Sequence, residues 1–258
     1  MCIISGPVNS VKGTKIFVMP SKEGRQLVVY KNEVESPAEN LMILPVPHPE
    51  SVQFETALMK RYKDLFSDLR SSLHWFSAER SVESGGWATR SASDTIPVLS
   101  VGSYRASVVF SVHELNRLNK SIFKIPKDLE QMLWDEYGRF GFVCAVLKEG
   151  VQDYEPLAYS HKRFDQELLF VPTKHYHRHD NIQPPFTQKG QADWEHTVYS
   201  LRTVREANHC DGFPSDRNRI DFTKMPKEFQ GSQGEPVHCW MKSGIWENKD
   251  LEFRISPY

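Results

Sequence analysis

The first fifty residues alternate short apolar runs with Gly and Pro, and this pattern constrains the fold more than any other feature. Short runs rich in β-branched and aromatic residues favour strands, and the Gly and Pro residues between them favour turns. We expect a β-meander with four strands, at residues 2–8, 14–19, 26–34 and 41–44. Pro45 and Pro47 are expected to end the fourth strand, because proline has no N–H to donate to a ladder.

A single apolar stripe at helical spacing follows the predicted strands. Its members are Phe54, Leu58, Tyr62, Leu65, Leu69 and Leu73. This spacing predicts a long amphipathic helix over about 52–75, which would bury one face of the meander. Shorter helices are expected at about 112–119 and 127–138, after a capping box and after Pro126. The sequence therefore predicts an α+β fold, with antiparallel sheets covered by these helices.

The chain has 258 residues, enough to bury a large core. We expect a main α+β domain over residues 1–200, with a mobile loop at 77–95, because a stretch of that length without periodicity is long for a connection in a compact domain. Residues 201–258 are expected to form a less regular C-terminal extension that packs on the main domain, because Pro, Gly and polar residues interrupt their strand-like runs.

Charge and hydropathy exclude several classes of protein. The net charge of −1 provides no attraction to nucleic acid. No apolar run approaches the roughly 20 residues of a membrane span. We expect no signal peptide, because no basic region precedes Cys2-Ile3-Ile4. The four scattered cysteines do not form a disulfide framework, so we expect reduced thiols and a cytoplasmic or other reducing intracellular location.

Several short phrases also carry a family resemblance. They are Ile43-Leu44-Pro45-Val46-Pro47, Val101-Gly102-Ser103-Tyr104, Gly141-Phe142-Val143, Pro156-Leu157-Ala158-Tyr159 and Leu168-Leu169-Phe170-Val171-Pro172-Thr173. With a Cys near the N-terminus, these phrases resemble a bacterial family known only as a domain of unknown function, usually found in exported or membrane-anchored proteins. The resemblance spans roughly residues 1–175. It implies a shared fold unit and no particular chemistry, because that family has no assigned activity.

Cys2 is the first candidate catalytic residue. Removal of Met1 would leave a thiol and a free α-amine on one residue, the arrangement of an N-terminal nucleophile that hydrolyses amides. Such an enzyme also needs an oxyanion hole, for which Asn32 or Asn40 would serve. The alternative is that Cys2 is a small apolar strand residue behind a retained Met1.

A histidine cluster is the candidate metal site. His175, His177 and His179 would share one face of an extended strand, and three imidazoles are a suitable set for zinc or iron. Asp180 or His196 would complete the coordination. The alternative is a polar loop whose histidines bind water or backbone groups, because no spacing typical of a known metal motif is present.

Trp87 is the candidate partner-binding residue. It lies beside Gly85-Gly86 in the aperiodic stretch at 77–95, and a Trp in a polar loop often contacts a partner surface. The alternative is a loop that folds back on its own domain.

Three functions remain open, and the sequence does not decide whether the protein is an enzyme. We favour a non-catalytic interaction or structural protein, with a protein partner or a homo-oligomer, because this reading needs no further geometry. A cysteine amide hydrolase built on Cys2 and a metal-binding protein built on His175, His177 and His179 are the alternatives.

Overall fold

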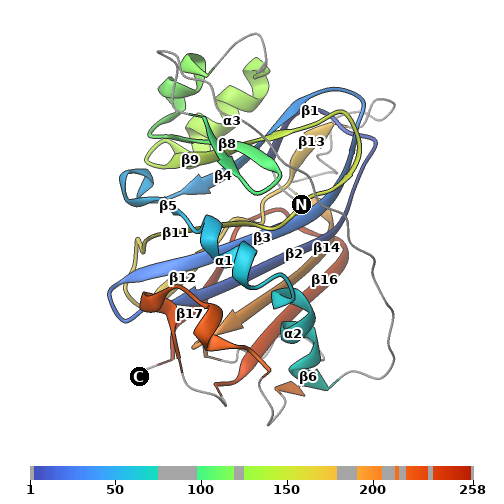
Figure 1. Cartoon of the computed structure of the whole chain (residues 1–258). Coiled ribbons are helices and arrows are strands. Elements are labelled where there is room, and N and C mark those ends of the chain that lie inside the picture. Colours follow the sequence, from blue (N-terminus) through green and yellow to red (C-terminus); the bar gives the residue numbers. More distant parts are fainter. Residues whose placement is uncertain are drawn as a thin grey trace.

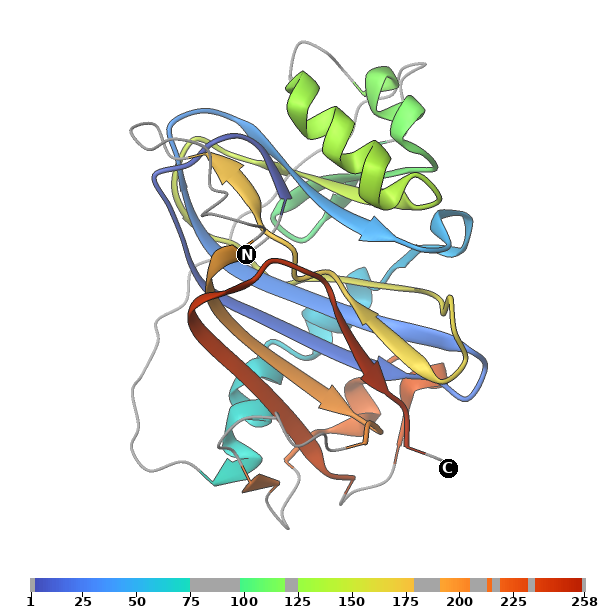
Figure 2. The same cartoon turned by 180° about the vertical axis from the view of Figure 1, so that it is seen from behind.

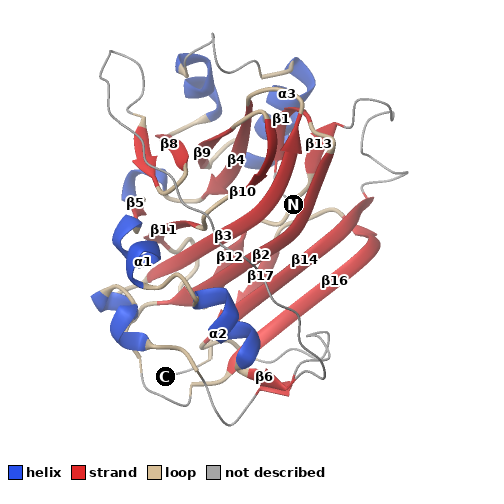
Figure 3. Cartoon of the chain, turned by 45° about the vertical axis from the view of Figure 1, so that its right-hand side comes forward, coloured by secondary structure: helices blue, strands red, loops and turns tan. Residues whose placement is uncertain are grey.

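The computed structural model of the chain describes residues 3–74, 98–118, 125–178, 191–204, 213–214, 219–231 and 235–256. Strands dominate this part of the chain, as Figure 3 shows in red. Two large sheets share a common core, and helices cover the other face of each sheet (Figure 1).

The larger sheet has seven strands. Its order is β16-β14-β2-β3-β11-β5, and β10 also pairs with β3. The bounds are β2 Ser10–Pro20, β3 Arg25–Ser36, β5 Gln53–Phe54, β10 Gly150–Asp153, β11 Leu157–Lys162, β14 Gln191–Leu201 and β16 Val237–Glu247. β14 runs parallel to β2 and antiparallel to β16. Residues on both sides of position 200 therefore belong to this one sheet.

The smaller sheet has six strands in the order β13-β1-β4-β9-β8-β7. The bounds are β1 Ile3–Pro7, β4 Asn40–Val46, β7 Leu99–Val101, β8 Tyr104–Val109, β9 Gly141–Leu147 and β13 Tyr176–Arg178. Two small antiparallel pairs complete the described strands. They join β12 Leu168–Val171 to β17 Leu251–Arg254, and β6 Leu73–His74 to β15 Phe213–Pro214.

Alternating side chains explain why the central strands are apolar on both faces. In β2, Ile16 and Val18 lie in the core between the sheets, whereas Phe17 and Met19 face the opposite way. This alternation follows from the two-residue period of a strand. Because both faces are covered, such strands appear in the sequence as nearly continuous apolar runs.

Helical segments cover the outer faces (Figure 2). α1 Thr56–Arg61 and α2 Leu65–Ser71 lie on the larger sheet, together with the short 3-10 turns η3 Phe222–Lys224 and η4 Lys227–Phe229. α3 Lys127–Tyr137 and the 3-10 turn η2 Val112–Arg117 cover the smaller sheet. A further 3-10 turn, η1 Pro49–Ser51, follows β4.

The prediction of an α+β fold covered by one long helix over 52–75 is wrong. Phe54 belongs to strand β5, and the stretch after it forms two short helices separated at Tyr62. The Tyr62 hydroxyl donates to Asp68 at 2.8 Å and accepts from the Asp221 backbone N–H at 2.8 Å. The first bond is local, and the second joins Tyr62 to a residue 159 positions away. Tyr62 has a non-helical backbone conformation (φ −129°), although its ring is still buried against the sheet.

The predicted four-stranded meander is also not what forms. β2 and β3 are a hairpin in the larger sheet, but β1 and β4 pair with each other in the smaller one. Pro45 does not end its strand, because β4 continues to Val46. Its register partner is Phe142 on β9, and β1 pairs with β4 only at Met42 and Ile43, so Pro45 lies beyond the β1 ladder.

In the described part of the chain, no helix has the length and apolar character needed to cross a membrane. Cys144 and Cys239 are buried, and neither forms a disulfide within the described residues. Burial raises the pKa of the Cys144 thiol, which fits a core residue rather than a reactive one.

Candidate functional site

The candidate site lies where β1 begins. β1 starts at Ile3, the residue after Cys2 in the sequence, and runs parallel to β13 with Ile3 opposite Tyr176. His175 directly precedes Tyr176, so it lies at the same end of the smaller sheet as the start of β1. The fold therefore places one histidine of the predicted metal cluster near the beginning of the chain.

The backbone before β13 is held by two side chains from the segment leading into β17. The His175 N–H donates to Asn248 Oδ1 at 2.8 Å, and Asn248 Nδ2 donates to the His175 carbonyl at 2.9 Å. The N–H groups of Thr173 and Lys174 donate to Asp250 Oδ1 at 2.8 and 2.9 Å. Three consecutive backbone donors that lie outside any ladder are thus satisfied.

Asp250 also connects this segment to α3, because the Tyr137 hydroxyl donates to its Oδ2 atom. Asp250 as a whole is partly exposed, but protein atoms surround its carboxylate closely. Desolvation therefore raises the pKa of Asp250, against the opposing effect of the three hydrogen bonds. Burial likewise raises the pKa of Tyr137.

A buried pair of imidazoles lies beside this segment. His175 Nε2 is 3.3 Å from His196 Nδ1, and the two residues are 4% and 2% exposed. His196 belongs to β14 of the larger sheet, so the contact links the two sheets. At this distance one ring nitrogen donates and the other accepts, and charging both rings would place two like charges together inside the protein.

The three-histidine metal site stays a prediction. The backbone of His177 lies in β13, and His179 and Asp180 fall outside the described residues. Within the described ranges, no three His, Cys, Asp or Glu side chains are grouped so that they could hold a metal ion. The structure does bring His175 together with His196, which the sequence proposed as a further ligand of the same site.

Cys2 and Trp87, the candidate nucleophile and the candidate partner-binding residue, also lie outside the described residues, and both stay predictions. The two proposed oxyanion amides have structural roles. Asn40 donates to the Pro7 carbonyl at 2.7 Å, at the end of β1 opposite its start, and Asn32 donates to the Met42 sulfur at 3.7 Å.

Asn248 and Asp250 are the residues that sequence reasoning missed. They lie 73 and 77 positions from the backbone donors they serve, at His175 and Thr173. The sequence around them, Glu247-Asn248-Lys249-Asp250, looks like an ordinary polar turn between strands. No local signal separates a polar residue with a distant buried partner from one that faces water.

These observations define a class: a β protein of two large sheets with helices on both outer faces, and a buried polar centre where the sheets meet. Solved structures of the same architecture are those of baculovirus P35. One has a TM-score of 0.50 at 12% identity, covering 99% of this chain and 100% of P35. A mutated baculovirus P35 after caspase cleavage has a TM-score of 0.51 at 13% identity, covering 94% and 99%. The likeness shows a shared fold.

No protein-family model matches this sequence, and no curated protein sequence matches it. The resemblance to the bacterial family therefore stays a prediction.

Proposed function

We propose that this chain is a non-catalytic, protein-binding protein, and that its partner is a protease of the caspase class. The observation that carries the proposal is the shared fold with baculovirus P35, one solved form of which is a mutated protein after caspase cleavage. The similarity extends over 94% or more of this chain in both comparisons, so it involves both sheets and their helical covers rather than one common motif.

The position of the sequence-predicted binding segment, residues 77–95, supports the same proposal. In the chain this segment follows β6, which comes directly after α2 on the larger sheet, and it precedes β7, the last strand of the smaller sheet. Val98 and Leu99, at the β7 end, are 46% and 44% exposed. Exposed apolar side chains next in sequence to a segment that contains a Trp are suited to contact another protein.

The test combines inhibition with mapping of the contact. The purified full chain is mixed at increasing ratios with each of a panel of active caspases, and the residual activity on a peptide substrate is measured. We expect activity against at least one caspase to fall as the ratio approaches one to one. Mass spectrometry of the same mixture should show a cut, if one occurs, between residues 75 and 97.

Trp87→Ala tests whether the predicted segment makes the contact, and Trp134→Ala is its matched control. Trp134 is 37% exposed on α3 and is distant in sequence from the segment. We expect inhibition to weaken in the first variant only. If every caspase keeps full activity and none binds the chain in a direct binding assay, the proposal is wrong.

A further inference from the structure

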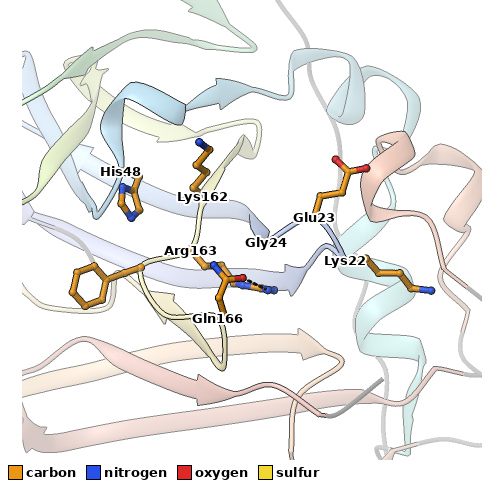
Figure 4. A pocket seen from close by; sticks show the side chains of 8 residues that line it. Lys22, Glu23, Gly24, His48, Lys162, Arg163 and Gln166 are labelled. Carbon is orange, nitrogen blue, oxygen red and sulfur yellow. Dashed lines mark hydrogen bonds between the residues drawn. The ribbon is translucent and has the colours of Figure 1, made fainter.

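A surface pocket of about 610 Å³ opens at the end of the β2–β3 hairpin. Three segments line it: the hairpin turn at Lys22–Gly24, His48 after β4, and residues 162–166 between β11 and β12 (Figure 4). Its lining holds three cationic side chains, Lys22, Lys162 and Arg163, against the single carboxylate of Glu23. The excess of positive charge favours an anionic occupant.

Arg163 is the unusual member, because its guanidinium is buried and no carboxylate among the described residues pairs with it. The residue is only 6% exposed. Nη1 donates to the Ser21 carbonyl at 3.2 Å and Nη2 donates to Gln166 Oε1 at 3.1 Å, and both acceptors are neutral. Nε has no hydrogen-bond partner in the described part of the chain. A buried charge is normally paired, so the wall of this pocket carries a positive charge that no described carboxylate neutralises.

Lys162 adds a second cation at the rim of the pocket. Its side chain is exposed and forms no ion pair with any residue that the structure describes. Its backbone N–H donates to Ser51 Oγ at 2.8 Å, which fixes the strand on which it lies. Lys162 is thus a cation that an approaching carboxylate can reach without breaking a described ion pair, and the buried Arg163 adds positive charge to the wall of the same pocket.

An exposed aromatic ring flanks these cations. Phe164 is 72% exposed, and its ring centroid lies 6.4 Å from that of His48 and 6.5 Å from that of Phe140. Exposed aromatic rings next to charged groups are typical anchors of protein interfaces. A free inorganic anion would gain nothing from Phe164, whereas a peptide can place an apolar side chain on the ring.

We infer that this pocket binds an acidic segment of a protein partner, with a carboxylate against Lys162, attracted also by the buried charge of Arg163, and an apolar neighbour on Phe164. The inference rests on the proposed protein-binding function and adds a second contact surface to it. The occupant is an acidic peptide segment rather than a nucleotide or a free phosphate, because the aromatic ring and the cations are used together.

The test uses a fluorescently labelled, end-blocked peptide with two glutamates flanking a leucine, and its glutamine analogue as control. Lys162→Gln and Phe164→Ala carry the test, because Arg163 also holds the loop and its replacement could disturb folding. Lys12→Gln and Phe110→Ala are matched controls on exposed residues outside the pocket. We expect each test variant to weaken peptide binding about fivefold, in keeping with a partly exposed charge-assisted or aromatic contact. Both controls should bind the peptide as the unmodified protein does.

Equal binding of the glutamine analogue, or unchanged binding in both test variants, would overturn the inference. So would displacement of the peptide by inorganic phosphate at matched ionic strength with an equal affinity, since it would indicate a site for a free anion. The same variants are also tested in the caspase assay. If the unmodified chain neither inhibits nor binds any caspase, the proposed function fails, and the peptide assay still tests the pocket. If inhibition occurs but both test variants inhibit and bind peptide normally, only the pocket inference fails.

Discussion

Replacement of Asp250 by Ala should strongly destabilise the fold, because one side chain accepts hydrogen bonds from three donors in a partly buried site. Its Oδ1 atom accepts from the backbone N–H groups of Thr173 and Lys174, and its Oδ2 atom accepts from the Tyr137 hydroxyl. Leaving a buried donor without a partner costs about 1–3 kcal/mol. Because Asp250 is partly exposed, water can replace part of the lost hydrogen bonding. Removal of a desolvated charge lowers the cost of the substitution further. We expect a net loss of about 2–4 kcal/mol in the free energy of unfolding.

Asp250→Asn is the matched control for this prediction. The amide keeps the oxygen that accepts from Thr173 and Lys174, removes the desolvated charge and disturbs only the bond to Tyr137. We expect it to lie within about 1 kcal/mol of the unmodified protein at neutral pH. Urea unfolding, followed by tryptophan fluorescence, gives the free energy of unfolding of both variants from the midpoint and the slope of the transition.

The pH dependence gives an independent check. Desolvation raises the pKa of Asp250 in the folded state, so the native protein binds its proton more tightly than the unfolded chain does. The stability contributed by protonation is complete below the unfolded pKa and is lost as the pH rises through the folded pKa. The unmodified protein should therefore gain stability relative to Asp250→Asn as the pH falls through this window. An Asp250→Ala variant that unfolds at the same urea concentration as the unmodified protein would refute the reasoning. So would an Asp250→Asn variant that loses as much free energy of unfolding as Asp250→Ala does.

Two further predictions concern the core. Leu69 is fully buried between α2 and the larger sheet, so Leu69→Ala should lower the free energy of unfolding by about 2–5 kcal/mol, and Leu69→Met by less than about 1.5 kcal/mol, in the same urea assay. Burial lowers the pKa of His161 to about 4, so the neutral ring is favoured in the fold. Between pH 6.5 and 4 the unmodified protein should lose up to about 3 kcal/mol relative to His161→Gln, and parallel stability curves would contradict this.

The strand signals near the N-terminus were informative because they are local. Ile16, Phe17, Val18 and Met19 are a β-forming run, and they form the buried centre of β2. Pairing between strands depends on distant residues, and it could not be predicted from such runs. Ile3 lies beside Tyr176 and Ile43 rather than beside the hairpin that follows it in the chain.

The apolar stripe at 54–73 has helical spacing, but this spacing led to the wrong prediction of one long helix. Leu58, Tyr62, Leu65 and Leu69 are all buried on one side, so their spacing marks the residues that face the sheet. Two short helices satisfy this spacing as well as one long helix does. The break depends on the hydrogen bond from the Asp221 N–H to Tyr62, 159 positions away, and no local pattern contains it.

The polar residues of the candidate site occur where the ladders stop. β12 ends at Val171 and β13 begins at Tyr176, and Pro172 has no N–H to satisfy. The three donors that remain, at residues 173, 174 and 175, are bound by side chains of the segment before β17. This arrangement fixes the start of β13 as firmly as a ladder would, and β13 in turn flanks the start of β1. Ile3, at the start of β1, therefore lies beside a strand whose entry is held by side-chain hydrogen bonds and which directly follows the buried imidazole of His175.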